Sequence, residues 1–95
     1  MKYIVHWEYC LEDQDKVTEK MVKSNEIREK DPEYFPKNLF PSQWTGHAKG
    51  FSIVEITDPA QFLNANMYWF PELKMKFVPC DDVATRMRLM LKSKK

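Results

Sequence analysis

Two histidines and one glutamate are the side chains of this sequence that are best suited to chemistry. His6 and His47 are the only imidazoles, and Glu55 stands in an otherwise apolar stretch. Two imidazoles and a carboxylate can bind a metal or form an acid–base pair if they converge. We predict them on separate strands whose register the sequence leaves open, and structural histidines are the alternative that we favour.

Glu55 is the most informative of these three residues. A carboxylate in an apolar strand is costly to bury unless it is paired or protonated. We therefore expect Glu55 to face a pocket or a dimer interface and to meet Lys74, Lys76 or a histidine. A purely structural salt bridge is the alternative.

Three tryptophans, Trp7, Trp44 and Trp69, are a high load for a chain of 95 residues. Together with Phe51 they are candidates for lining a pocket that binds a flat or apolar ligand. Packing in the core or at a dimer interface explains them equally well.

Other catalytic signatures are missing from the sequence. It has no glycine-rich phosphate loop, no C-x-x-C and no H-E-x-x-H. Cys10 lies beside an acidic stretch and has no neighbouring cation that would lower its pKa, so we do not expect a nucleophile there. We expect neither a bound metal nor a cofactor.

Residues 49–56 are predicted to form the central strand. Phe51, Ile53 and Glu55 alternate with Ser52 and Val54, and both faces are largely apolar, which indicates a strand covered on both sides. Thr57-Asp58-Pro59 then predicts a helix start, with Asp58 as N-cap and Pro59 at the first helical position.

The remaining elements follow from periodicity and turn residues. Strands are predicted at residues 2–9, 43–49 and 72–80, helices at 11–30 and 59–70, and a terminal helix after Asp81 or Asp82 that ends in Lys92, Lys94 and Lys95. Right-handed crossovers give this β-α-β-β-α-β order a ferredoxin-like α+β fold with a four-stranded antiparallel sheet. Strands 2–9 and 49–56 form its centre, both long helices cover one face, and residues 1–95 form one domain.

Two segments of this fold have unusual distributions of apolar residues. The inward side of helix 11–30 holds only Val17 and Met21 as apolar residues, so this helix buries little core. The predicted loop at 31–42 contains three prolines among Tyr34, Phe35, Leu39 and Phe40. It either packs as a satellite core against the sheet or covers a pocket.

Composition limits the class of protein. With 43% hydrophobic and 31% charged residues and a net charge of +1, the chain is typical of a soluble globular domain without a strong field for nucleic acid or membranes. It lacks an apolar run of membrane-spanning length and a signal peptide, so we expect a cytoplasmic location. Cys10 and Cys80 are expected to be free thiols.

Five parts of the sequence together carry a resemblance to a known family: MKYIVHWE, Trp44 with His47, GFSIVEITDP, the helix ending in Trp69, and ELKMKFVPCDD. They resemble a domain-of-unknown-function family of the dimeric α/β-barrel superfamily. The resemblance implies a homodimer that pairs through its sheets and keeps a pocket between sheet and helices. Some members of that superfamily are cofactor-free monooxygenases, chlorite-type haem enzymes or muconolactone isomerases. None of their catalytic motifs can be placed on residues of this sequence.

A second resemblance is to the RNA-recognition motif. KGFSIVEI at residues 49–56 follows much of the RNP1 pattern, and Phe51 matches one stacking position. Ile53 and Ile56 stand where aromatic residues are required for base stacking. We therefore expect no nucleic-acid binding.

Two classes of function remain. The first is a homodimeric protein that binds a small molecule, with an enclosed aromatic pocket; if it is an enzyme, it is of the monooxygenase or isomerase kind. The second is an interaction module in which the tryptophans are packed and no cavity is left.

Overall fold

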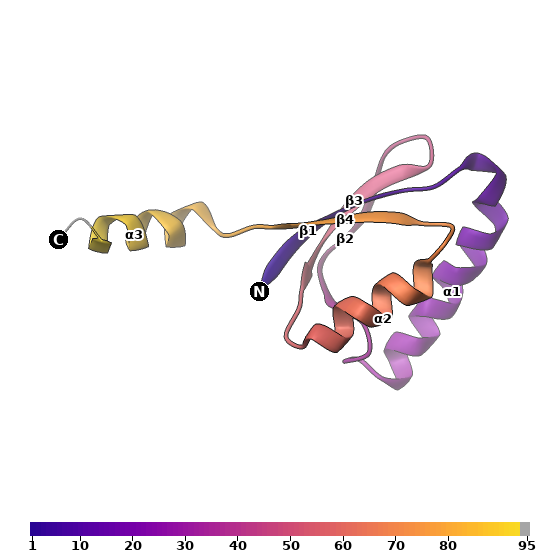
Figure 1. The fold of residues 1–95 in the computed structure, drawn as a ribbon, viewed down its shortest axis with the longest axis horizontal. Coiled ribbons are helices and arrows are strands. Elements are labelled where there is room, and N and C mark those ends of the chain that lie inside the picture. Colours follow the sequence, from indigo (N-terminus) through magenta and orange to yellow (C-terminus); the bar gives the residue numbers. More distant parts are fainter. Residues whose placement is uncertain (94–95) are drawn as a thin grey trace.

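The computed structural model describes residues 1–93. The chain follows the predicted order, in which β-α-β-β-α-β is succeeded by a helix (Figure 1). The elements are β1 (Lys2–Glu8), a 3-10 helix (Leu11–Asp13), α1 (Gln14–Lys30), β2 (Lys37–Gly46), β3 (Lys49–Glu55), α2 (Pro59–Trp69), β4 (Lys74–Pro79) and α3 (Val83–Ser93). Lys94 and Lys95, which we predicted at the end of the terminal helix, lie outside the described residues.

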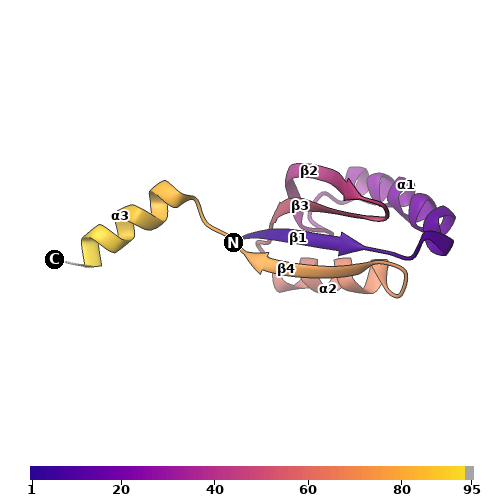
Figure 2. The ribbon, with the colours of Figure 1, turned by 90° about the horizontal axis from the view of Figure 1, so that it is seen from above.

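The four strands form one antiparallel sheet in the order β2-β3-β1-β4 (Figure 2). The prediction that the first and third strands form the centre is confirmed. The side chains of Tyr3, Val5 and Trp7 face the same side as those of Ser52 and Val54, since Val5 lies opposite Ser52 and Tyr3 opposite Val54. The ferredoxin-like α+β fold is thus the observed one.

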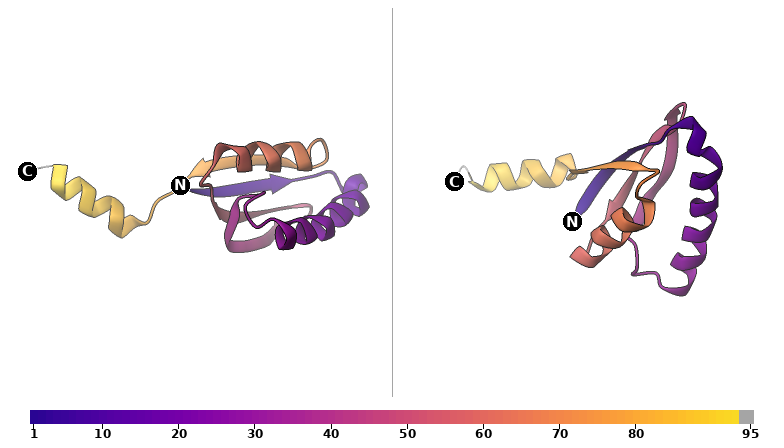
Figure 3. Two further views of the ribbon diagram at one scale, coloured as in Figure 1. Left: turned by 90° about the horizontal axis from the view of Figure 1, so that it is seen from below. Right: turned by 45° about the vertical axis from the view of Figure 1, so that its right-hand side comes forward.

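Both long helices lie on the same face of the sheet (Figure 3). We call the opposite face, which no described helix covers, the open face. α3 extends away from the sheet as a continuation of β4 (Figures 1 and 2), and none of its side chains is buried. None of the helices in residues 1–93 is long and apolar enough to cross a membrane.

The start of α2 has the predicted cap. The Asp58 carboxylate accepts a hydrogen bond from the Ala60 amide at 2.9 Å, and Pro59 occupies the first turn. Gln61 completes a capping box, because its Oε1 accepts from the amide of the N-cap Asp58 at 3.4 Å. The same oxygen also accepts from the Thr57 amide at 2.9 Å. Asp13 also occupies an N-cap position, before α1, but its side chain makes no capping hydrogen bond.

The predicted loop at residues 31–42 is wrong in its second half, because β2 already begins at Lys37. Between Phe40 and Gln43 the strand takes one residue more than β3 does between Ile53 and Phe51. Proline lacks an amide hydrogen and is tolerated at such a bulge on an edge strand, which is where Pro41 lies. The hairpin to β3 then turns through His47 and Ala48, which we had placed inside a strand.

The loop that remains, residues 31–36, contributes to the core. Phe35 is 1% exposed and contacts the ring of Tyr68 with a centroid distance of 5.2 Å. Its neighbour Pro36 lines a cavity beneath the sheet. The two cysteines are free, as predicted, and follow the ends of β1 and β4.

Candidate functional site

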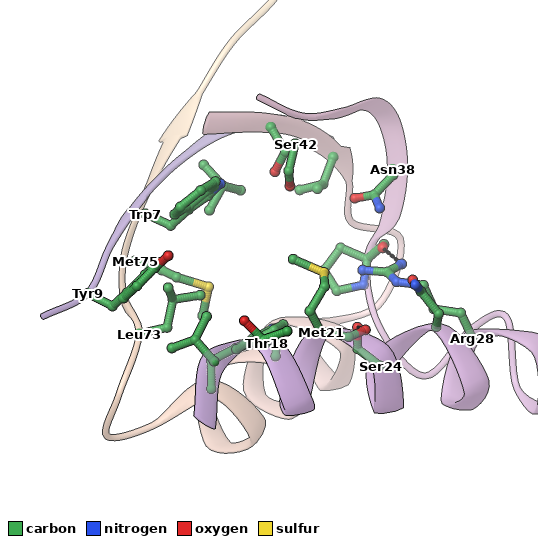
Figure 4. Close-up of a pocket in the computed structure, with 18 of the residues that line it drawn as sticks. Trp7, Tyr9, Thr18, Met21, Ser24, Arg28, Asn38, Ser42, Leu73 and Met75 are labelled. Carbon is green, nitrogen blue, oxygen red and sulfur yellow. Dashed lines mark hydrogen bonds between the residues drawn. The ribbon is translucent and has the colours of Figure 1, made fainter. Parts of the chain in front are cut away.

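A cavity of about 330 Å³ lies between the helix-covered face of the sheet and helices α1 and α2 (Figure 4). It exists because few large side chains fill this space. α1 buries only Val17 and Ser24, and Ser24 and Ser52 present small side chains from opposite walls. The thin apolar stripe predicted for this helix therefore has a structural consequence, because only a small core packs around Val17 and a hollow remains beside it.

Polar contacts along one side of α1 hold this helix over the cavity. The Tyr68 hydroxyl donates to the Lys20 carbonyl at 2.6 Å, and the Lys20 ammonium donates back to the Tyr68 carbonyl at 2.9 Å. The same ammonium contacts the buried carboxylate of Glu72 at 2.8 Å, and Lys16 approaches Glu72 at 3.5 Å. α1 is thus tied to α2 and to the start of β4 without filling the space beneath it.

The Lys20 hydrogen bond lowers the pKa of Glu72 below the usual range of a carboxyl group. The backbone amide and the positive charges of Lys20 and Lys16 act in the same direction, whereas burial opposes them. Glu72 is therefore a structural carboxylate that stays ionised beside the cavity.

One end of the cavity is aromatic. The Trp7 ring meets Trp44 edge to face at a centroid distance of 5.4 Å and stacks beside Tyr9 at 6.3 Å. The Tyr9 hydroxyl donates to Gln14 Oε1 at 2.7 Å, which links this cluster to α1. Trp69 lines the cavity from α2 and is 9% exposed. The structure therefore gathers all three tryptophans around one space.

The indole nitrogen of Trp7 is buried, and among residues 1–93 it has no hydrogen-bond partner. Its ring lies against Gly50, the residue directly opposite on β3. A Cβ atom at Gly50 would approach the Trp7 ring to 2.5 Å, so glycine makes room for the indole. A buried donor without an acceptor costs about 1–3 kcal/mol, and a ligand acceptor would remove this cost.

The other end of the cavity is polar. The Arg28 guanidinium reaches into it from α1, below the Asn38 amide of β2 (Figure 4). It donates to the Pro36 carbonyl at 2.7 Å and lies 5.3 Å from the centroid of the Phe35 ring. Burial lowers the pKa of Arg28, but an arginine remains charged at neutral pH. In the part of the chain that the structure describes, Arg28 forms no ion pair with a carboxylate.

His6, His47 and Glu55 do not converge. His6 lies on the open face opposite Phe51, and His47 lies in the β2–β3 turn. Glu55 is four residues from Phe51 along β3, which places it about 13 Å from the level of His6. Its partner is the Met1 ammonium at 3.1 Å, not one of the lysines or histidines that we had proposed. Within residues 1–93 no group of metal-binding side chains is found.

Phe51, the fourth aromatic candidate, lies on the open face and not in the cavity. Its ring stacks on Phe40 of β2 with a centroid distance of 5.9 Å and an interplanar angle of 12°. Four apolar residues lie side by side across neighbouring strands of this face, in the order Phe40 (β2), Ile53 (β3), Ile4 (β1) and Val78 (β4). An apolar row therefore crosses all four strands on this face.

Sequence reasoning missed the polar half of the cavity, although a signal was present. Gln14, Val17, Met21, Ser24 and Arg28 follow helical spacing along the inward side of α1, and all five line the cavity. A stripe in which polar residues replace apolar ones indicates a face that is turned toward the sheet but does not pack against it. The orientation of Arg28 depends on the helix–sheet distance, which the stripe does not specify.

The fold and the cavity define a ferredoxin-like α+β protein with a hollow between its sheet and its helices. The chain belongs to the DUF3303 family, a domain of unknown function whose family model matches residues 1–94. No curated protein and no solved structure matches the chain significantly.

Proposed function

We propose that this protein is a homodimer that binds a small apolar or aromatic molecule in the cavity between sheet and helices. The observation that carries the proposal is the buried Trp7 indole, whose N–H has no partner among residues 1–93 and whose ring lines the cavity. The volume, about 330 Å³, lies within the range of small-molecule sites, about 300–1,000 Å³.

The alternative is an interaction module without a ligand, for which we expected packed tryptophans and no cavity. Trp7 and Trp69 are indeed packed against other rings, yet a hollow remains beside them. Most of the lining surface is apolar, and hydroxyl, amide and guanidinium side chains provide its polar groups, a combination that is usual for ligand sites. These features favour the binding hypothesis.

A cavity-filling substitution tests the binding proposal. Ser24→Leu places a larger apolar side chain in the hollow, at the cost of a hydrogen bond from the Ser24 hydroxyl to the Met21 carbonyl at 2.7 Å. Ser93→Leu is a matched control on α3, because the Ser93 hydroxyl makes the same kind of bond to the Met90 carbonyl at 2.9 Å. Thermal unfolding of both variants reports whether the fold is kept.

The readout is tryptophan fluorescence during titration with a panel of aromatic and lipid-like metabolites. We expect at least one compound to change the emission of the wild type and of Ser93→Leu, and Ser24→Leu to weaken its binding by about tenfold or more. The proposal would be contradicted if no compound of the panel changed the tryptophan emission of the wild type or of Ser93→Leu. It would also be contradicted if the compound bound Ser24→Leu and the wild type with equal affinity.

The open face of the sheet supports the homodimer. Its apolar row of Phe40, Ile53, Ile4 and Val78 is exposed or half-buried, and two charged rows flank its centre. In each of these a glutamate lies between two lysines; the rows are Lys37–Glu55–Lys2 and Lys49–Glu8–Lys74. Because both rows carry both signs of charge, the face can pair with a second copy of itself.

The resemblance to the dimeric α/β-barrel superfamily supports the same assembly, since its members usually pair through their sheets. It also leaves room for chemistry of the monooxygenase or isomerase kind in the cavity, to which we assign no catalytic residue. Free Cys10 and Cys80 fit a reducing compartment such as the cytoplasm.

A further inference from the structure

We propose that the ligand of this cavity is an amphipathic acid whose carboxylate binds Arg28 and whose apolar or aromatic body extends toward Trp7. This inference rests on the proposed binding function and adds the chemical class and the orientation of the ligand. Two observations within the described residues carry it: the Arg28 charge at one end of the cavity has no ion-pair partner, and the buried Trp7 N–H at the other end has no acceptor.

The charge argument compares the two cations that α1 directs inward. Lys20 has a carboxylate of its own, since Glu72 lies 2.8 Å from its ammonium. Among residues 1–93, Arg28 donates a hydrogen bond only to the Pro36 carbonyl, at 2.7 Å, which occupies one of its five N–H donors. A half-buried guanidinium without an anion is expensive, and a carboxylate or a similar anion is the partner that its planar fork fits best.

The position of Arg28 is fixed before any ligand arrives. The bond to Pro36 and the contact with the Phe35 ring, 5.3 Å away, hold the guanidinium at the mouth of the hollow. Asn38 lies beside it and adds an amide that can donate to the same acid (Figure 4). Such preorganisation reduces the entropy cost of binding.

The middle of the cavity is apolar, with Met21 on α1 facing Met75 on β4 (Figure 4). Methionine side chains adapt to irregular apolar shapes. At the far end the Trp7 ring lines the cavity, and its buried N–H has no hydrogen-bond partner among the described residues. The arrangement suits a ligand with an acid at one end and a ring or a hydrogen-bond acceptor at the other.

A matched pair of probes tests the inference. 4-Phenylbutyrate and 4-phenylbutanol share one carbon skeleton and differ in the acid, and isothermal titration calorimetry at neutral pH measures both with the full chain. We expect the acid to bind the wild type at least about tenfold more tightly than the alcohol. Equal affinity for the two probes would overturn the inference and leave the binding function standing. Binding of neither probe would contradict both.

Variants then assign the preference to Arg28. Arg28→Gln is expected to abolish the preference for the acid while alcohol binding stays within about twofold of the wild type. Arg28→Lys, which keeps the charge but not the planar fork, is expected to retain part of it. Arg88→Gln, on exposed α3, removes the same charge and is expected to keep the full preference. An acid preference that survives in Arg28→Gln would overturn the inference.

Discussion

Gly50 lies directly opposite Trp7 in the sheet, and a Cβ atom at Gly50 would come within 2.5 Å of the Trp7 ring. The same Cβ would also clash with the backbone carbonyl of Gln43 on β2. The absence of a side chain at this one position therefore sets both the place of the indole at the cavity and the close approach of β2 to β3.

Gly50→Ala is expected to destabilise the protein by at least about 1–3 kcal/mol, because ring and backbone must both move. Chemical denaturation measures the free energy of unfolding, and the tryptophan emission of the folded state should shift. Gly46→Ala is the control. A Cβ there meets the flexible Lys49 side chain at 2.6 Å, and we expect a change within about 0.5 kcal/mol. Equal effects of the two substitutions would contradict this role of Gly50.

The lowered pKa of Glu72 predicts how the free energy of unfolding depends on pH. Its pKa is lowered in the folded state, first of all by the Lys20 hydrogen bond, so its ionised form stabilises the fold above the unfolded carboxyl pKa of 4.5. This contribution is lost as the pH falls through the lower folded pKa. We therefore expect the difference in urea midpoint between wild type and Glu72→Gln to be largest at neutral pH and to shrink steadily below pH 4.5.

Glu29→Gln, which removes an exposed carboxylate of α1, provides the baseline for that comparison. A difference between wild type and Glu72→Gln that stays constant down to strongly acidic pH would show that the ion pair with Lys20 does not stabilise the fold.

The proposed dimer can be tested on two phenylalanines of similar exposure. Phe40 on the open face is 43% exposed and Phe62 on α2 is 40% exposed, and each contacts one other phenylalanine ring. Phe40→Glu puts a charge into the apolar row, so we expect the dimer dissociation constant to rise by about tenfold or more. Phe62→Glu should leave it within about threefold of the wild type.

Sedimentation velocity over a range of concentrations measures this constant, and circular dichroism shows whether each variant is folded. A wild type that stays monomeric throughout, or equal weakening by the two substitutions, would argue against pairing through the open face. A monomer would also direct attention back to the RNA-recognition alternative for this sheet.

The sequence was sufficient for the central strands because their local signals agree with one another. β3 is apolar on both faces, has a glycine at its second position, and is followed by an N-cap and a proline, so only one placement fits all of these features. β2 was harder to recognise, because prolines such as Pro36 and Pro41 are typical of loops and rare within strands. Pro41 is accommodated only because β2 is an edge strand with an extra residue, which no local pattern reveals.

The site was predictable on its aromatic side and not on its polar side. Tryptophan is rare and large, so Trp7, Trp44 and Trp69 stand out in the sequence, and they do surround one cavity. The separation of His6 from Glu55 depends on register, and the role of Arg28 depends on how far α1 lies from the sheet. Both are set by tertiary packing and not by local sequence.

The central claim, that a dimer holds a small molecule in the space under α1, is tested most directly by native mass spectrometry. Gently purified wild type, Ser24→Leu and Ser93→Leu are compared before and after 4-phenylbutyrate and 4-phenylbutanol are added. We predict a wild-type dimer that carries extra mass, the same species for Ser93→Leu, and a bare dimer for Ser24→Leu. A bare wild-type monomer under all conditions, or extra mass that Ser24→Leu retains in full, would contradict the account.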